Sequence, residues 1–380
     1  MRGALKVLPA YLEKTFLYLL ILIVPILIYP FLIDGRVIDL RKIREIGFYS
    51  FGIIILTFLQ KNKWLRYFII WCVINWWLNF FIPRESYVGL TNIFSALALY
   101  IGLKYVIKKN IIKINTVLKI VCIVALFQFV WLIMQKFNFD PVFYPISPTR
   151  DRVFGYRMPP IGWSGNPVIL AIFFAMSSFL TLHYFTIRKI PVFFFIILSS
   201  MFILKNATMV ICLSAGLIFM FIYKYPKKIL PILLIIILLC TFFVYVKKPN
   251  FDRLPIWKQL IEKSTTARPI VGCGINYFSH LFIKDKKNII WNEAHNEPLQ
   301  IYLELGMIGL CLFTGFIISK YIEFFKIRRN NLQLYLISSL TAFLVAGISM
   351  FPFHLAQLSF YAILFLACLD RSYETELLQS

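Results

Sequence analysis

Long apolar runs separated by short polar segments organise the whole chain. A helix needs about 20 mostly apolar residues to cross a bilayer. Twelve runs approach that length, although the second and seventh are short for a full span: 15–33, 46–60, 65–83, 88–107, 114–136, 166–187, 190–204, 207–223, 228–246, 298–319, 332–350 and 353–369. The pattern predicts an all-α polytopic membrane protein of about twelve transmembrane helices, with residues 1–380 as one integral membrane domain. It also predicts a short solvated tail from Asp370.

The basic residues between the runs predict the orientation. Lys and Arg concentrate in short cytoplasmic loops. With the N-terminus inside, the inner segments hold more Lys and Arg than the short outer loops, for example Lys104, Lys108, Lys109 and Lys113 after the fourth run. The bias places both termini in the cytoplasm. The longest polar segment, 247–297, follows the ninth run and is therefore predicted on the outer face.

Composition supports a membrane protein and narrows its partners. The chain is 60% hydrophobic and only 15% charged, whereas soluble domains are about 45–50% apolar and about 25% charged. The net charge is +23, but the basic residues lie between apolar runs, so a nucleic-acid partner is not expected. The charge suits anionic membrane lipids or an anionic lipid-linked substrate. No CxxC or Cys/His spacing indicates a disulfide framework or a zinc site.

The outer segment begins with an amphipathic stretch. Leu254, Trp257, Leu260 and Ile261 fall on one face of a helix. An apolar face with Trp and flanking Lys is typical of a helix lying in the membrane interface.

His295 is the main candidate for chemistry in this segment. Asn296 is a suitable helix N-cap and Pro298 fits the first turn after it, so His295 lies just before the tenth span. The partial positive charge of a helix N-terminus favours a neutral imidazole, which can accept a proton near pH 7. The alternative is a boundary histidine satisfied by the backbone. His280 and His354 are weaker candidates.

Arginines of the outer face form a second candidate group: Arg150, Arg152, Arg157, Arg253 and Arg268. A guanidinium binds phosphate oxygens with two parallel hydrogen bonds and stays charged. Surface arginines also bind lipid headgroups. Arg253 stands out because it opens the amphipathic stretch, and Arg152 because it precedes a turn-rich segment before the sixth span.

Two charged residues at the membrane have open roles. Glu304 lies inside the tenth span, where an acid is a functional candidate or the partner of a nearby Arg or Lys. Lys205, between the seventh and eighth spans, is an interfacial anchor or a phosphate contact. The outer segments contain no DxD or paired-acid spacing, which disfavours a carboxylate-bound metal.

Three stretches resemble the O-antigen ligase and O-antigen polymerase superfamily. Arg253–Trp257 with Arg268–Phe278 is similar to its Arg-x-x-x-Trp and Pro-hydrophobic-Gly-x-Gly segments. His295–Leu299 with Glu304–Gly309 is similar to its His-Asn-x-x-Leu and Glu-Leu-Gly-x-x-Gly signature. Gly165-Asn-Pro167 is similar to its Gly-Asn-Pro turn. One departure is Lys205, which stands where the family often has arginine and offers a point charge rather than a fork.

The resemblance implies a fold and a mechanism. The fold would be that of GT-C glycosyltransferases, and the donor a glycan on undecaprenyl diphosphate at the periplasmic face of a bacterial inner membrane. The enzyme would be inverting, with no metal or other cofactor. His295 would activate an acceptor sugar hydroxyl and Arg253 would hold the diphosphate leaving group. Further diphosphate contacts would be Arg152, Arg268 and Lys205, and the supporting residues Asn296 and Glu304.

The resemblance leaves alternatives for the acceptor and the class of function. A ligase would transfer the glycan to lipid A–core, and a polymerase of the same superfamily would join it to another lipid-linked repeat. A lipid-linked glycan flippase is the alternative of another class. It predicts charges along a path and broken helices in matching halves, and the sequence indicates neither. A scaffold without catalysis would tolerate His295→Ala. The sugar, the linkage and the oligomeric state stay open.

Overall fold

The computed structural model describes part of the chain: residues 32–33, 36–37, 63–79, 85–137, 166–185, 199–200, 203–204, 206–224, 253–281, 283–284, 290–291, 293–326 and 330–377. The second and ninth predicted spans, and nearly all of the first and seventh, lie outside these residues. Arg152 and Lys205 lie outside them as well.

The described part is mostly helical, and eight of the predicted runs are α-helices: α3 (Lys63–Leu78), α4 (Glu85–Lys108), α5 (Ile114–Lys136), α7 (Pro167–Tyr184), α9 (Ala207–Lys224), α12 (Glu297–Lys326), α13 (Asn331–Ala346) and α14 (Ala356–Leu377). Among the described residues, α5, α7, α9 and α12 are long and apolar enough to cross a membrane. The apolar helices therefore confirm the prediction of a helical, membrane-embedded protein.

Smaller elements complete the described chain. The predicted amphipathic stretch is the helix α11 (Arg253–Ala267), and the short helix η2 spans Tyr277–His280. Two antiparallel pairs of two-residue strands are present: β1 (Leu32–Ile33) with β2 (Arg36–Val37), and β3 (Ile283–Lys284) with β4 (Ile290–Trp291). The prediction of helix up to residue 33 is wrong at its end, because Leu32 and Ile33 form β1.

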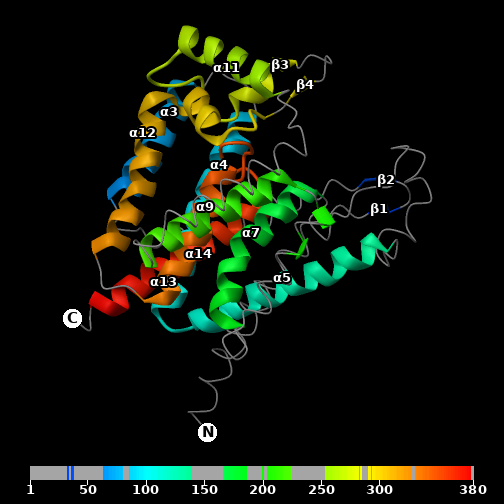
Figure 1. The fold of residues 1–380 in the computed structure, drawn as a ribbon. Helices are drawn as coiled ribbons and strands as arrows, with labels where there is room; N and C mark the ends of the chain where they lie inside the picture. Colours follow the sequence, from blue (N-terminus) through cyan, green and yellow to red (C-terminus); the bar gives the residue numbers. More distant parts are fainter. Residues whose placement is uncertain are drawn as a thin grey trace.

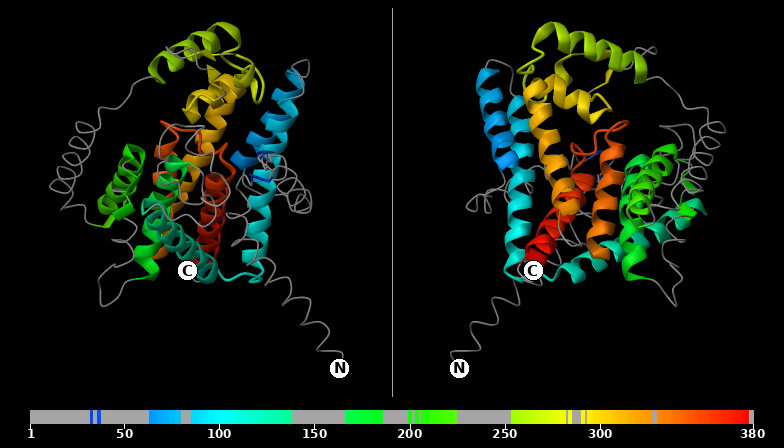
Figure 2. Two further views of the ribbon diagram at one scale, coloured as in Figure 1. Left: turned by 90° about the vertical axis from the view of Figure 1, so that its right-hand side faces the viewer. Right: turned by 60° about the vertical axis from the view of Figure 1, so that its left-hand side comes forward.

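The helices pack as a bundle with α11 lying across one end (Figures 1 and 2). α13 contacts α7 and α9, α14 contacts α4, and α12 contacts α3. The main apolar core lies among α4, α5, α7, α9, α13 and α14. A second buried cluster lies under α11 and includes Ile256, Leu260 and Phe278. A third lies between α3 and α12 and includes Cys72, Ile301 and Leu305. These two smaller clusters fix the end of the bundle that carries the candidate site.

α11 uses a different face from the one predicted. Ile256 and Leu260 are buried against the protein, while Leu254 and Ile261 are exposed. The expectation of one face with Leu254, Trp257, Leu260 and Ile261 is therefore wrong in part. One side of the helix, with Ile256 and Leu260, faces the protein, and the exposed apolar residues Leu254 and Ile261 lie beside it.

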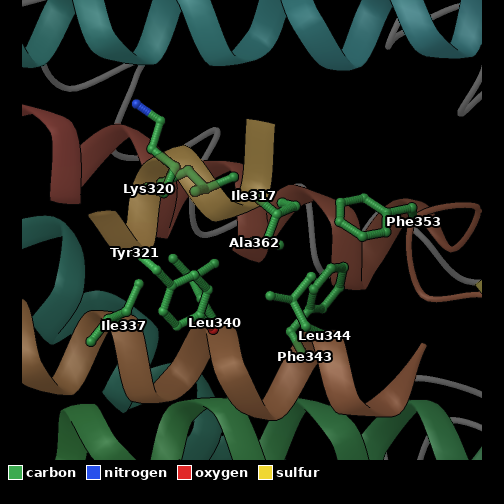
Figure 3. A pocket seen from close by; sticks show the side chains of 10 residues that line it. Ile317, Lys320, Tyr321, Ile337, Leu340, Phe343, Leu344, Phe353 and Ala362 are labelled. Atoms are coloured by element: carbon green, nitrogen blue, oxygen red, sulfur yellow. The ribbon is translucent and has the colours of Figure 1, made fainter. Parts of the chain in front are cut away.

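A small apolar cavity lies among α12, α13 and α14 (Figure 3). Tyr321, Leu340, Phe343 and Phe353 are among the side chains that line it. The stem of Lys320 borders the cavity, and its amino group points away from the apolar side chains. The polar groups of the lining residues are paired elsewhere, the Tyr321 hydroxyl with Thr341 Oγ1 at 2.8 Å and Lys320 Nζ with Asp370. The cavity therefore belongs to the packing of the bundle.

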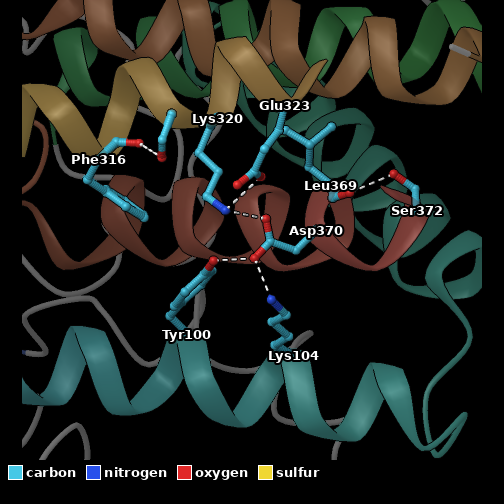
Figure 4. A network of polar contacts seen from close by, with 9 residues as sticks. Tyr100, Lys104, Phe316, Lys320, Glu323, Leu369, Asp370 and Ser372 are labelled. Atoms are coloured by element: carbon cyan, nitrogen blue, oxygen red, sulfur yellow. Dashed lines mark hydrogen bonds and ion pairs between the residues drawn. The ribbon is translucent and has the colours of Figure 1, made fainter. Parts of the chain in front are cut away.

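A buried ionic cluster joins α4, α12 and α14 (Figure 4). These helices meet there at the end of the bundle away from α11 (Figure 2). Asp370 accepts from Lys320 Nζ at 2.9 Å and from Lys104 Nζ at 2.9 Å. The Tyr100 hydroxyl also donates to Asp370, and Lys320 pairs with Glu323 at 3.0 Å. The prediction of a solvated tail is wrong at its start, because α14 continues through Asp370 to Leu377 and only 3% of the Asp370 side chain is exposed.

Candidate functional site

The tenth predicted span, α12, is interrupted near its start. Gly306 has φ 69° and ψ −172°, outside the helical region. Gly272, in the loop after α11, has φ 82°. A Cβ on Gly306 would lie 2.5 Å from the Gly272 nitrogen, and a Cβ on Gly272 would lie 2.4 Å from the Gly306 nitrogen. Glycine is required at both positions because the two backbones touch.

The loop 268–274 supplies partners for peptide groups around the interruption. The bonds run from Cys273 N–H to the Leu303 carbonyl (2.8 Å), from Gly274 N–H to the Glu304 carbonyl (3.0 Å), from Met307 N–H to the Pro269 carbonyl (3.0 Å) and from Ile308 N–H to the Ile270 carbonyl (3.3 Å). An unpaired peptide group in a membrane costs several kcal/mol. The Pro-hydrophobic-Gly-x-Gly and Glu-Leu-Gly segments therefore meet as one structural unit.

A polar stripe on α3 contacts the same unit. Trp71, Asn75 and Asn79 recur at helical spacing on one face. Trp71 Nε1 donates to the Leu305 carbonyl at 2.9 Å, and Asn75 Nδ2 donates to the carbonyls of Val271 and Glu304. Sequence reasoning missed this stripe. Its signal was the pair of asparagines four residues apart inside an apolar run.

His295 lies immediately before α12, as predicted. Asn296 Oδ1 accepts from the Leu299 N–H at 3.0 Å, so the predicted N-cap is confirmed. The imidazole lies edge-on between Trp291 and Phe351, with ring centroids 4.6 and 4.7 Å away. Its Nδ1 is buried and has no hydrogen-bond partner among the described residues.

The surroundings of His295 keep its imidazole neutral. Burial and then the positive charge of Arg253 lower the pKa of His295 to about 4. The lowered pKa of His295 agrees with the sequence prediction of a neutral imidazole. Its causes are burial and Arg253, whereas the sequence prediction rested on the helix N-terminus. Near pH 7 the ring is therefore unprotonated and can accept a proton.

Arg253 is the first residue of α11 and approaches the same region. Its Nη1 donates to the Ser349 carbonyl, and its Nη2 lies 3.8 Å from Met350 Sδ. Burial lowers the pKa of Arg253, but a guanidinium remains charged in proteins. It has five N–H donors, so these two contacts leave donors for an anion. Trp257 Nε1 donates to the Ala294 carbonyl at 2.9 Å and ties α11 to the residue before His295.

Glu304 is buried two residues before the interruption. Its carboxylate accepts from Gln300 Nε2 at 3.2 Å and from the backbone N–H of Asn276. Among the described residues Glu304 forms no ion pair with Arg or Lys, which was one of its two predicted roles; its hydrogen-bond donors are amides, and His354 is a nearby charge. Gln300 also donates to the Glu293 carboxylate. No three His, Cys, Asp or Glu side chains in the described segments are grouped to hold a metal ion.

The predicted phosphate-binding residues do not all come together. Arg268 Nη1 donates to Asn79 Oδ1 at 2.9 Å, so Arg268 lies beside the end of α3. The described contacts do not join it to Arg253 or His295. Arg152 and Lys205 fall outside the described residues. The structure therefore unites His295, Arg253, Asn296 and Glu304 around the start of α12.

Comparison with known proteins adds no family to this geometry. No family model matches the chain, and no curated protein matches it.

Proposed function

We propose that this protein is a membrane glycosyltransferase that moves a glycan from undecaprenyl diphosphate to a hydroxyl acceptor. The observation that carries the proposal is a neutral imidazole next to a permanently charged guanidinium; the imidazole Nδ1 is buried and has no hydrogen-bond partner in the described part of the chain. A general base and an anion-binding cation are the two groups that such a transfer requires.

The reaction uses these groups as follows. The acceptor hydroxyl gives its proton to His295 as its oxygen attacks the anomeric carbon of the donor. A new glycosidic C–O bond forms while the bond between that carbon and the diphosphate oxygen breaks. The electron pair leaves with the diphosphate, whose added charge Arg253 stabilises. Attack from the face opposite to the leaving group inverts the anomeric centre.

Asn296 and Glu304 support the reacting groups in this proposal. Asn296 fixes the start of α12 through its cap and also donates to the Ile348 carbonyl at 3.0 Å. Glu304 anchors Gln300 and the Asn276 backbone. Arg268 would contact the diphosphate or an anionic lipid from the side of α3, and Arg152 and Lys205 are proposed as additional phosphate contacts.

The proposed architecture has twelve spans arranged as in GT-C enzymes, in a bacterial inner membrane. Both termini would be cytoplasmic and the segment 247–297 periplasmic. Two features support this arrangement. α11 and the start of α12 share one end of the bundle (Figure 2), and the lysine-rich segment from Lys108 to Lys113 joins α4 to α5 at the other end.

The proposed acceptor is lipid A–core, which makes the protein an O-antigen ligase. A polysaccharide polymerase of the same superfamily would use the same site with a lipid-linked acceptor. A flippase is less well supported. Interrupted helices occur in transporters, and α12 has such an interruption, but loop 268–274 and α3 occupy its peptide groups.

Reconstitution tests the proposal. Purified protein in liposomes is given an undecaprenyl-diphosphate glycan and lipid A–core or a second lipid-linked glycan, with EDTA present. We expect product, and we expect His295→Ala to lower the rate by about 10²–10⁴-fold, the usual contribution of a general base. Arg253→Ala should lower the rate by about 10²–10³-fold, as for other charge-stabilising groups.

Lys258→Ala on α11 is the matched control, because 79% of the Lys258 side chain is exposed. It should transfer at the wild-type rate. Full activity in His295→Ala, or a requirement for a divalent metal, would contradict the proposed mechanism.

A further inference from the structure

The loop 347–355 between α13 and α14 contacts Arg253, His295 and Asn296 of the candidate site. The Gly347 carbonyl accepts from the Glu297 N–H at 2.8 Å, and the Ile348 carbonyl accepts from Asn296 Nδ2 at 3.0 Å. The Ser349 carbonyl accepts from Arg253. Phe351 lies edge-on against His295. The predicted runs 332–350 and 353–369 left only Phe351 and Pro352 between these two helices.

An ion pair fixes the far end of this loop to α12. His354 Nδ1 lies 3.0 Å from Glu297 Oε1, and the Phe353 N–H donates to Glu297 Oε2 at 3.2 Å. Both oxygens of one carboxylate therefore hold two consecutive residues. Only 4% of the Glu297 side chain is exposed, compared with 32% of His354.

We propose that Glu297 and His354 are positioning residues: their ion pair fixes loop 347–355, and the loop in turn orients both Arg253 and His295. This inference rests on the proposed transfer reaction, and it adds two residues to it. Neither residue needs to touch the substrate. The loop provides the carbonyl that aims the guanidinium and the aromatic ring that supports the imidazole.

The charges around His354 maintain the ion pair near neutral pH. Burial lowers the pKa of His354, but Glu297 outweighs that effect, with help from Glu293 and Glu304, and the pKa is raised to about 10. Gln300 Nε2 also lies 3.4 Å from His354 Nε2. A raised histidine pKa stabilises the folded state fully below its ordinary value of 6.5, and that stabilisation is lost as the pH rises through about 10.

The first test measures the loop without measuring activity. Wild type, Glu297→Gln and His354→Gln are placed in nanodiscs, and amide hydrogen exchange of residues 347–355 is followed by mass spectrometry at neutral pH. We expect faster exchange in both variants. Glu262→Gln is the control, because it removes an exposed carboxylate that pairs with Lys258 on α11 at 4.0 Å. Unchanged exchange in both variants would overturn the proposal, and the partly exposed His354 supplies a variant that should fold.

The second test measures transfer. A misplacement of about 1 Å at an active site costs up to about 10²-fold in rate, so Glu297→Gln and His354→Gln should lower kcat by about 10- to 100-fold. His354→Arg keeps a charged donor at high pH. It should retain transfer and lose the activity decline that we expect in wild type near pH 10.

The two tests separate the inference from the proposed function. Absence of transfer by wild type with every acceptor would refute the function, while the exchange result would still decide whether the ion pair orders the loop. Wild-type transfer combined with an unchanged kcat in Glu297→Gln would refute the positioning role alone.

Discussion

At the scale of single residues, His295 combines an unusual backbone with a controlled protonation state. Its φ of 49° lies in the left-handed region, which few residues other than glycine adopt. Such conformations persist where the surroundings determine them strongly. Here the Asn296 cap follows immediately, and Trp291 and Phe351 flank the ring. These neighbouring groups fix the position of the His295 imidazole.

A titration of His295 tests the electrostatic argument at this scale. We expect its NMR signal to titrate near pH 4, because burial and Arg253 lower its pKa from 6.5 to about 4. The chain has only four histidines, so selective labelling suffices. Arg253→Met should raise the pKa only part of the way, because burial is the larger cause.

The same shift predicts two pH dependences. The acid decline of kcat/KM should lie near pH 4, and the free energy of unfolding should fall as the pH drops from 6.5 towards 4, since the unfolded chain then binds the proton more readily. A midpoint near pH 6.5 for His295 in the wild-type protein would contradict the account.

At the scale of elements, the interruption of α12 joins three segments that are distant in sequence. Loop 268–274 provides the backbone partners, and α3 provides Trp71 and Asn75. Glu304 sits next to the interruption and holds Gln300 and Asn276. The position of α11, and with it Arg253, therefore depends on this junction.

Replacing either glycine at the junction should disrupt it. A Cβ at Gly306 would lie 2.2 Å from the Ile270 carbonyl oxygen, and one at Gly272 would lie 2.3 Å from the Glu304 carbonyl oxygen. Backbone strain at such positions costs about 1–3 kcal/mol, and the contacts with rigid backbone add to it. We expect Gly272→Ala and Gly306→Ala each to lower the free energy of unfolding by at least that amount.

Thermal unfolding in nanodiscs measures this effect. Met307→Ala is the control, since it changes the adjacent residue of the same helix, whose side chain is 49% exposed. Equal stability of Gly306→Ala and Met307→Ala would show that the close contact between the two backbones is wrong.

The helices were the most predictable elements because their signals are local. The run 114–136 coincides with α5, whose mostly apolar sequence follows Lys113 and ends at Lys136. The interruption of α12 was not predicted, because a glycine within an apolar run leaves the hydrophobic pattern intact. Asp370 was misassigned for a related reason: its lysine partners come from α4 and α12, and their approach is a tertiary event.

Parts of the candidate site were predictable for the same reason. Asn296 and Pro298 predict a helix start immediately after His295, and the structure confirms that start. The loop that supports them belongs to another helix pair, so the contact between Glu297 and His354 left no local trace. Arg268 has suitable chemistry and lies on a nearby loop, yet its guanidinium bonds to Asn79 at the end of α3 rather than joining the candidate site. Its sequence position could not show this partner.

At the scale of the whole molecule, the two ends of the bundle differ in chemistry. One end holds α11, His295 and the paired segments of the candidate site. The other holds the buried cluster around Asp370, in which Lys104 and Lys320 offset its charge. Breaking a buried ionic network leaves uncompensated charge and is strongly destabilising. The cluster therefore clamps α4, α12 and α14 at the end predicted to face the cytoplasm.

The proposed function requires the candidate site to face the compartment in which a lipid-linked glycan is presented, and cysteine labelling determines which side it faces. Lys258→Cys on α11 and Lys109→Cys after α4 are made in a background without the seven native cysteines. Intact bacterial spheroplasts are then treated with a membrane-impermeant maleimide. We expect labelling at position 258 in intact spheroplasts, and at position 109 only after permeabilisation. The reverse pattern would place Arg253 and His295 in the cytoplasm and contradict the account.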